Sequence, residues 1–330
     1  MRILCKGFNF CNQLNAEGHT VERFCTTLDS DSINYFQLSH TFSVALINDK
    51  LYLNCNLVDK DQIDLTGVGK IKKITVSDNS NNAIQILNSC GDIFKVSFDD
   101  FVVRQLPKFV DSEDVIKNIS SYSKLNAAYT EKGCLYSIPE RLEFDNKDIV
   151  DMQTGREHGV LLDKWGKVFT FGSGRLGQLG TGYLEDHQNP VIVEALGGIT
   201  IIQIAAGGWH SSAISRDGDL YVWGLNVSGQ LGLAKPDEEI KKNVSVMATP
   251  RVVDIHGCVE NNVIQVACGS RHTIVLLDNN ALYGCGWNEY KQLKNDEQKN
   301  YNFFVFIEDF SQERIEKILC GPWNSAVICK

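Results

Sequence analysis

DMQTGREHGVLLDKWGKVFTFGSGRLGQLG from Asp151, QIAAGGWHSSAISRDGDLYVWGLNVSGQLG from Gln203 and QVACGSRHTIVLLDNNALYGCGWNEYKQL from Gln265 are three copies of one pattern. Each copy has Gly-x-x-His, an alternating apolar run, a two-residue turn, a second run, and a glycine-rich turn that closes in Gln-Leu. Self-similarity of this length indicates a repeat architecture, in which each unit buries its apolar face against its neighbours.

The residues of the repeat favour strands over helices. The runs LYVWG, VFTFG and HTIVLL are rich in β-branched and aromatic side chains, which suit a pleated sheet. The pairs Asp217-Gly218, Lys132-Gly133 and Asn279-Asn280 join such runs and suit tight hairpin turns. We therefore expect small antiparallel sheets in a radial stack.

Fainter copies extend the pattern over the whole chain. The stretch KILCGPWNSAVICK carries the first half of a unit at Gly321, and ILCKGFNFCNQL at the start carries the second half. Weaker copies lie around Ser39, in the stretch 74–96 and around Tyr122, so that seven units centre near positions 39, 80, 122, 155, 207, 269 and 321. The chain is predicted to be an all-β, seven-bladed β-propeller, closed by pairing of N-terminal and C-terminal strands in one blade.

The spacing of the units predicts the domain organisation. Residues 1–330 form one propeller domain, in which 1–15 complete the last blade, 20–150 form degenerate blades and 150–330 form well-formed repeats. The short interval between Tyr122 and Gly155 predicts a truncated blade followed by a linker, PERLEFDNKD. The long interval between Gly207 and Gly269 predicts an inserted loop at residues 233–250.

Composition and charge bound the class of protein. Of 330 residues, 43% are hydrophobic and 22% charged, as in ordinary globular proteins, so a long disordered chain is not expected. The net charge of −9 argues against a broad electrostatic grip on nucleic acid or on an anionic membrane. No stretch reaches 18 apolar residues, and the 11 cysteines include no C-x-x-C pair. We expect a monomer with reduced thiols, and with no membrane and no strong direct nucleic-acid binding.

The Gly-x-x-His, Asp-Gly-x-Leu-Tyr-x-Trp-Gly and Gly-Gln-Leu-Gly elements resemble the regulator of chromosome condensation repeat, whose fold is a seven-bladed β-propeller. The stretches GREHGVLLDKWGKVFTFGSGRLGQLGTGYLE, AAGGWHSSAISRDGDLYVWGLNVSGQL, CGSRHT and CGPWN resemble one member of this family more closely. That resemblance implies a nuclear, chromatin-linked protein that binds a JmjC-type 2-oxoglutarate oxygenase and influences histone methylation and chromosome segregation. A cytoplasmic location is left open beside the nuclear one, and histones or chromatin are expected to be reached through the partner.

The repeated glycines and histidines have a structural interpretation. His158, His210 and His272 occur once per blade, so they are expected to hydrogen-bond between neighbouring strands rather than to converge on a metal or a reacting group. The sequence has no H-E-x-x-H, no G-x-S-x-G and no metal-spaced Cys/His cluster, so we expect no enzyme, no cofactor and no metal. The structural repeat positions are Gly155, His158, Gly207, His210, Gly269, His272 and Gly321.

The residues that break the repeat are the candidates for partner binding. The fold needs the flanking glycine and histidine, but has no evident need for tryptophan or arginine between them. Equivalent loops of a propeller collect on one face, and these two residue types dominate interface hot spots. The predicted partner-binding residues are Arg156, Trp209, Arg271 and Trp323, with capping of the channel as the alternative for the two tryptophans.

Two further functional interpretations remain open at this point. The oxygenase partner that the resemblance implies makes Arg141, expected in an exposed linker, a possible modification site by hydroxylation. The parent family's activity, guanine-nucleotide exchange on a small GTPase, is the alternative to the adaptor function. Three of the seven repeats are eroded, so exchange ranks second.

Overall fold

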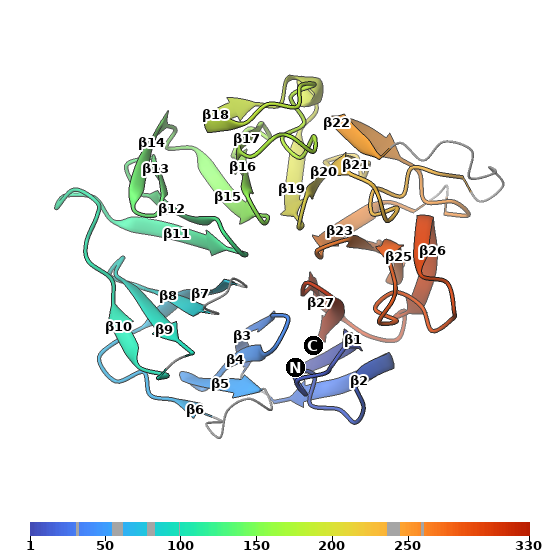
Figure 1. Ribbon diagram of the computed structural model, residues 1–330, viewed down its shortest axis with the longest axis horizontal. Coiled ribbons are helices and arrows are strands. Elements are labelled where there is room, and N and C mark those ends of the chain that lie inside the picture. Colours follow the sequence, from blue (N-terminus) through green and yellow to red (C-terminus); the bar gives the residue numbers. More distant parts are fainter. Residues whose placement is uncertain (31–32, 55–61, 78–82, 99, 236–244, 259–260) are drawn as a thin grey trace.

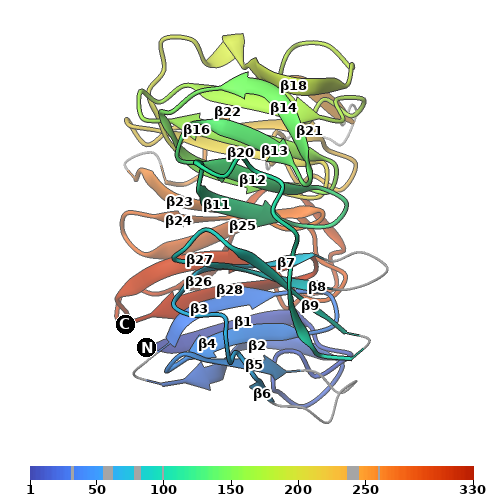
Figure 2. The same cartoon turned by 90° about the vertical axis from the view of Figure 1, so that its left-hand side faces the viewer.

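Seven four-stranded antiparallel sheets stand around a central axis, in chain order, in the computed structural model of the protein (Figure 1). The structure describes residues 1–330 except 31–32, 55–61, 78–82, 99, 236–244 and 259–260. Seen from the side, the sheets stack as the blades of a disc (Figure 2). The prediction of an all-β, seven-bladed propeller is therefore confirmed.

The blades share one topology, in which the first strand lies nearest the axis and the fourth lies outermost (Figure 1). The blades of the first half are β3 (Ile33–Leu38), β4 (Ser43–Ile47), β5 (Lys50–Asn54), β6 (Gln62–Ile63); β7 (Ile71–Ser77), β8 (Ala83–Asn88), β9 (Ile93–Ser97), β10 (Val103–Gln105); and β11 (Ile116–Ser121), β12 (Asn126–Thr130), β13 (Cys134–Ser137), β14 (Glu140–Asp145). The next three are β15 (Ile149–Thr154), β16 (His158–Asp163), β17 (Val168–Gly172), β18 (His187–Ile192); β19 (Ile201–Ala206), β20 (His210–Ser215), β21 (Leu220–Leu225), β22 (Val246–Val253); and β23 (Val263–Cys268), β24 (His272–Leu277), β25 (Ala281–Trp287), β26 (Asn300–Asp309).

The closing blade joins the two ends of the chain. Its order is β27 (Ile315–Cys320), β28 (Asn324–Cys329), β1 (Arg2–Phe8) and β2 (Thr20–Asp29), and the two termini lie side by side (Figure 1). Strands β1 and β28 pair without a bulge from Arg2 opposite Cys329 to Gly7 opposite Asn324. The N-terminal contribution extends beyond residues 1–15, because β2 is the outer strand of this same sheet rather than part of a degenerate blade.

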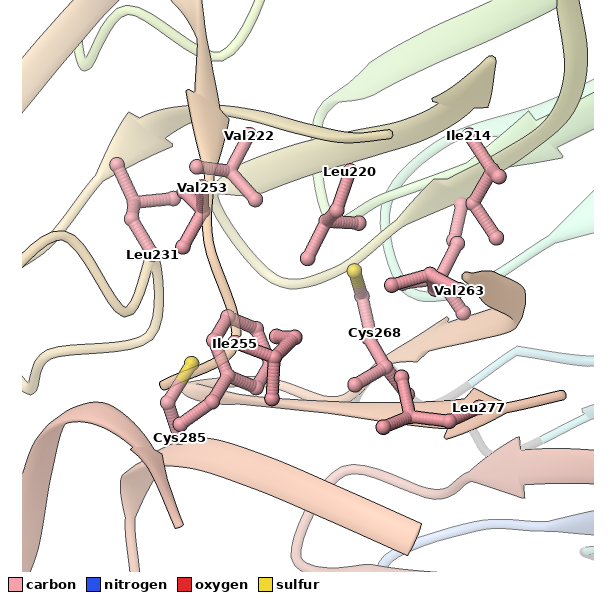
Figure 3. Close-up of a cluster of buried hydrophobic side chains, with 14 residues drawn as sticks. Ile214, Leu220, Val222, Leu231, Val253, Ile255, Val263, Cys268, Leu277 and Cys285 are labelled. Atoms are coloured by element: carbon pink, nitrogen blue, oxygen red, sulfur yellow. The ribbon is translucent and has the colours of Figure 1, made fainter. Parts of the chain in front are cut away.

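The hydrophobic core lies between neighbouring blades. One cluster joins Val222 and Leu220 of β21 to Val263 and Cys268 of β23, all less than a tenth exposed (Figure 3). A comparable cluster joins the blades β3–β6 and β7–β10, whose sequences have lost the repeat motif. The eroded half therefore keeps the alternation of buried apolar residues that blade packing requires, although it has lost the motif residues.

The prediction of a truncated blade between Tyr122 and Gly155 is wrong. Strands β11 to β14 form a complete four-stranded sheet. This blade is shorter in sequence because one of its connections is short. Only Ile138 and Pro139 join β13 to β14, whereas residues 173–186 join β17 to β18 in the next blade. The expected linker PERLEFDNKD is largely β14.

The inserted loop is shorter than predicted. Residues 246–250 of the predicted 233–250 belong to β22, the outer strand of its blade. The charged stretch between Asp237 and Lys242 lies outside the described residues. Among the described residues, no helix has the length and apolar character needed to cross a bilayer. The single helical element among them is the 3-10 turn η1 (Glu194–Leu196).

Candidate partner-binding face

The glycine of each Gly-x-x-His loop makes room for the histidine and for the next blade. A Cβ atom placed on Gly207 would lie 2.4 Å from Cε1 of His210 and 2.5 Å from the carbonyl oxygen of Gly269. Both distances are too short for a carbon atom to occupy, so only glycine fits there. The same crowding recurs at Gly155 and at Gly269. In the closing blade, Asn324 takes the place of the histidine against Gly321.

Each of these histidines forms a hydrogen bond with a hydroxyl group in the next blade. The hydroxyl belongs to the residue directly after the histidine of that blade, or after the asparagine in the closing blade. The distances from Nε2 to the hydroxyl oxygen are 2.9 Å for His158 to Ser211, 2.8 Å for His210 to Thr273, and 3.3 Å for His272 to Ser325. All three imidazoles are fully buried. The three histidines therefore link four consecutive blades. Each imidazole reaches the next blade, and the three do not converge on a common centre.

The hydroxyl groups fix the tautomer of the imidazoles. The Thr273 hydroxyl donates to the carbonyl oxygen of Gln230 at 2.7 Å, and the Ser211 hydroxyl donates to that of Gln178 at 3.0 Å. A carbonyl oxygen can only accept, so His210 and His158 must donate from Nε2–H, which leaves Nδ1 unprotonated. Burial lowers the pKa of both imidazoles to about 3 and that of His272 to about 4. The histidines are thus neutral structural groups near pH 7.

The loops that join first to second strands form a continuous rim on one face. Backbone N–H groups donate from loop to loop, from Lys124 to the Arg156 oxygen at 3.1 Å and from Arg156 to the Gly208 oxygen at 3.2 Å. Gly208 then donates to Gly269 at 3.1 Å, and Ser270 to Pro322 at 3.0 Å. We call the surface carried by these loops, together with the connections between third and fourth strands at the same blade ends, the loop face.

A side-chain contact crosses this rim. The Tyr122 hydroxyl, from the loop between β11 and β12, lies 2.8 Å from the Ser270 hydroxyl, from the loop between β23 and β24. The blades β15–β18 and β19–β22 stand between these two along the ring. The loops of this side of the propeller are therefore held together as one unit.

Three of the four predicted partner-binding residues meet. The guanidinium carbon of Arg156 lies 4.9 Å from the ring centroid of Trp209, and that of Arg271 lies 5.8 Å from the same centroid. Both distances are within the range of cation–π attraction. Trp209 and Arg156 are half-buried and Arg271 is exposed. These three residues form the Arg–Trp cluster.

Trp323 lies in a different group of side chains on the same face. Its ring centroid is 4.4 Å from that of His40, 5.1 Å from Phe8, 5.4 Å from Tyr290 and 5.7 Å from Trp287. All five rings are half-buried. We call this group, with the exposed Phe10 that stacks on Phe8, the aromatic cluster.

The sequence alone did not reveal the aromatic cluster, because its members come from three blades. Trp287, the last residue of β25, is half-buried, and its ring packs on that of Trp323. Trp223 is fully buried, and its indole N–H donates to the Gln178 oxygen at 2.9 Å. The backbone N–H of Trp287 donates to the Arg271 oxygen at 2.8 Å, which places the two clusters side by side.

Arg141 lies apart from both clusters, on the outer strand β14. Its side chain is half exposed, and its Nη2 donates to Oδ1 of Asp145 at 2.9 Å. Exposure makes the guanidinium accessible, and its hydroxylation stays a prediction. Within the described part of the chain, no three His, Cys, Asp or Glu side chains are grouped to hold a metal ion.

The glycine-rich stretch between Gly172 and Gly177 is a blade turn. Its G-x-G-x-x-G spacing matches that of a dinucleotide-binding loop, but such a loop must open a helix, whereas this stretch follows β17 and leads into β18. A Cβ atom at Gly174 would lie 1.8 Å from the carbonyl oxygen of Glu185. The glycines therefore serve the packing of this turn.

The fold and its repeated loops define a seven-bladed β-propeller with a Gly-x-x-His element in its well-formed blades. A family model described as the regulator of chromosome condensation (RCC1) repeat matches residues 166–214 and 217–276, and a second model of the same description matches 201–230 and 263–292. The matched segments, which lie in three consecutive blades of the propeller, are similar to this repeat.

Curated proteins are similar in sequence to part of the chain. RCC1 domain-containing protein 1 of Homo sapiens is 34% identical over 208 residues, which are 53% of this chain and 55% of the human protein. The ultraviolet-B receptor UVR8 of Arabidopsis thaliana is 31% identical over 215 residues, 59% of this chain and 47% of the receptor. The chain thus spans about half the length of the curated relatives it matches.

Solved structures share the fold over nearly the whole chain. Prp20p of Saccharomyces cerevisiae, described together with its binding to Gsp1p and histones, has a TM-score of 0.80 at 18% identity and covers 99% of this chain and 91% of its own. Human WBSCR16 has a TM-score of 0.67 at 16% identity, with coverage of 100% and 86%. At such identities the likeness concerns the propeller fold alone.

Proposed function

We propose that this propeller is a non-enzymatic adaptor that binds a JmjC-type 2-oxoglutarate oxygenase through the loop face. The observation that carries the proposal is the separation of roles within the Gly-x-x-His loops. Glycine and histidine are committed to blade packing, whereas Trp209, Arg156 and Arg271 between them meet on the surface. Arginine and tryptophan in a partly desolvated patch are typical of binding hot spots.

The kind of partner follows from the resemblance to RCC1 domain-containing protein 1. Acting with an oxygenase on chromatin, the propeller would influence histone methylation and chromosome segregation from a nuclear location. The fold shared with Prp20p, which was described with its binding to Gsp1p and histones, supports the broader class of a chromatin-related or GTPase-related regulator. Exchange on a small GTPase is the competing function within that class.

Affinity capture from nuclear extract tests this proposal. The bait is the tagged protein as wild type, as the double variant Trp209→Ala/Trp323→Ala, and as Trp165→Ala. Trp165 is a matched control, because it is 65% exposed, lies under the Lys164 ammonium and sits in the turn between β16 and β17, at the opposite blade end from the loop face. Quantitative mass spectrometry measures the recovered proteins.

The adaptor function predicts that a JmjC oxygenase is recovered with the wild type and with Trp165→Ala and is lost with the double variant. Recovery of a small GTPase instead, strongest when nucleotide is removed, would make exchange the function. Equal recovery of the oxygenase with the folded double variant would show that the loop face is not its binding site.

A further inference from the structure

Two neighbouring arginines of the loop face have no carboxylate partner among the described residues. Neither Arg156 nor Arg271 has a carboxylate oxygen within 4 Å among the described residues. Both guanidinium groups are instead held at the ring of Trp209. The five N–H donors of each group therefore have no acidic partner in the part of the chain that the structure describes.

Several other cations of this face pair with carboxylates of neighbouring residues. Lys124, one loop before the Arg–Trp cluster, pairs with Glu157. In the connections between third and fourth strands, Arg175 pairs with Asp186 at 3.0 Å, and Lys299 pairs with Glu289 at 2.9 Å. The Arg–Trp cluster, by contrast, gathers at one ring two guanidinium groups that have no such partner among the described residues, in a chain whose net charge is −9.

The cluster suits an anion rather than a cation. In an aromatic cage, the face of a tryptophan ring binds an ammonium group of the ligand. Here two guanidinium groups of the protein itself already lie at the ring of Trp209, so a further cation would be repelled. Guanidinium groups held in place by stacking bind carboxylates in a bidentate manner and lose little side-chain freedom on doing so. The ligand chemistry that fits is therefore a pair of carboxylates.

The aromatic cluster adds an apolar surface beside this charge. The backbone carbonyl of Arg271 accepts a hydrogen bond from the backbone N–H of Trp287, whose ring packs on Trp323. Phe10, at the edge of the cluster, is 59% exposed. A large apolar side chain of a partner could bury surface against these rings. Charge and apolar surface are adjacent on the loop face.

We infer that the loop face binds an acidic peptide segment of the partner protein, with its carboxylates on Arg156 and Arg271 and a neighbouring aromatic or large aliphatic side chain against the aromatic cluster. This inference rests on the proposed function, since it specifies the chemistry of the segment that the adaptor holds. The inference also explains why an acidic segment would bind at this one place, because the net negative charge of the chain repels such a segment elsewhere on the surface.

Fluorescence anisotropy with a defined probe tests the inference. The probe is a fluorescein-labelled peptide of Asp and Glu residues around a central pair of Phe residues, compared with its Asn/Gln analogue and with an analogue in which Phe is replaced by Ala. The protein is the full chain as wild type, as Arg156→Gln/Arg271→Gln and as Arg216→Gln. Arg216 is the matched control, since it is exposed in the turn between β20 and β21 at the opposite blade end.

The expected result is saturable binding of the acidic probe, weakened about tenfold or more by Arg156→Gln/Arg271→Gln and unchanged by Arg216→Gln. The Asn/Gln analogue should bind at least about tenfold more weakly, and the affinity of the acidic probe should fall as salt is raised. The variant Arg156→Lys/Arg271→Lys, which keeps the charge and loses the planar fork, should fall between wild type and the Gln variant. Thermal unfolding of each variant verifies that it is folded.

Equal affinity for the acidic probe and its Asn/Gln analogue would overturn the inference, as would an equal loss with Arg216→Gln. This failure is distinguishable from failure of the proposed function. If the folded Arg156→Gln/Arg271→Gln protein still captures the oxygenase while Trp209→Ala/Trp323→Ala does not, the loop face is the binding site and its ligand is not acidic. If neither variant affects capture, the loop face is not the binding site, and if the wild type captures no oxygenase, the proposed function itself fails.

Discussion

The imidazole of His210 and the hydroxyl of Thr273 lie 2.8 Å apart across the boundary between two blades, and both are completely buried. The hydroxyl passes the interaction on to the Gln230 carbonyl at 2.7 Å. Replacing Thr273 with Val keeps the shape and removes the hydroxyl, which leaves the His210 N–H and the Gln230 oxygen without this partner. We predict that Thr273→Val lowers the free energy of unfolding by about 1–3 kcal/mol, measured by urea denaturation.

Thr181→Val serves as the control for this measurement, because the Thr181 hydroxyl lies in a surface turn and makes only two long contacts, donating to the Tyr183 oxygen at 3.5 Å and accepting from the Tyr183 N–H at 3.4 Å. Its effect should stay within about 0.5 kcal/mol. A cost at Thr273 no larger than that at Thr181 would mean that the hydroxyl does not link the blades.

Acid should destabilise the propeller through its buried histidines. Their folded pKa values of about 3 to 4 lie below the ordinary value of 6.5, so the unfolded chain binds protons that the folded chain does not between about pH 6.5 and pH 4. Stability is therefore full above pH 6.5 and falls on acidification, by about 1.4 kcal/mol per pH unit for each histidine. Urea denaturation at a series of pH values measures this slope.

The replacement His210→Asn provides the comparison, since Asn324 occupies the equivalent place in the closing blade. The variant should lose about a third of the slope that the three histidines contribute to stability against pH in this window. An unchanged slope would contradict the assignment of His210 as a group that is neutral when folded.

A methyl group should be enough to disturb the Gly-x-x-His loop. We predict that Gly207→Ala destabilises the protein by about 1–3 kcal/mol, because its Cβ would meet the His210 ring and the Gly269 carbonyl. The control is Gly198→Asn. Gly198 has a left-handed backbone conformation, which asparagine tolerates, and a Cβ atom there would meet no neighbour within 4 Å, so this replacement should lower the free energy of unfolding by less than about 1 kcal/mol. Thermal unfolding compares the two, and equal midpoints would refute the crowding.

The N-terminal strand should carry part of the core of the ring. Ile3 of β1 is fully buried between the closing blade and the blade β3–β6. We predict that Ile3→Ala costs about 2–5 kcal/mol, whereas Ile202→Ala, at a side chain 53% exposed, costs little. A loss below about 1 kcal/mol at Ile3 would show that β1 is not part of the cooperative fold.

Much of the fold was predictable because the repeat encodes the contacts between neighbouring units. Six of the seven predicted loop positions, 39, 122, 155, 207, 269 and 321, fall between the first and second strands of their blades, and position 80 lies outside the described residues. The prediction of a truncated blade was wrong because a short interval between repeats does not show whether a strand or a connection has been shortened. Ile138 and Pro139 replace a whole connection while all four strands remain.

The candidate site was predictable only where its members share a repeat position. Arg156, Trp209 and Arg271 stand at neighbouring places in successive loops, so the alignment itself brings them together. Trp323 occupies the same loop, but its neighbours Phe8 and Tyr290 come from a chain end and from a connection of another type. Such contacts depend on how the ring closes, which no local pattern states.

Hydrogen–deuterium exchange of the purified propeller, alone and bound to its captured oxygenase, tests the central claim most directly. The account predicts slower exchange in the loops around Arg156, Trp209, Arg271 and Trp323, and unchanged exchange in the turns at the opposite blade ends, around Trp165 and Asp217. Slower exchange at those opposite turns, with the four loops unaffected, would contradict the assignment of the loop face as the partner-binding surface.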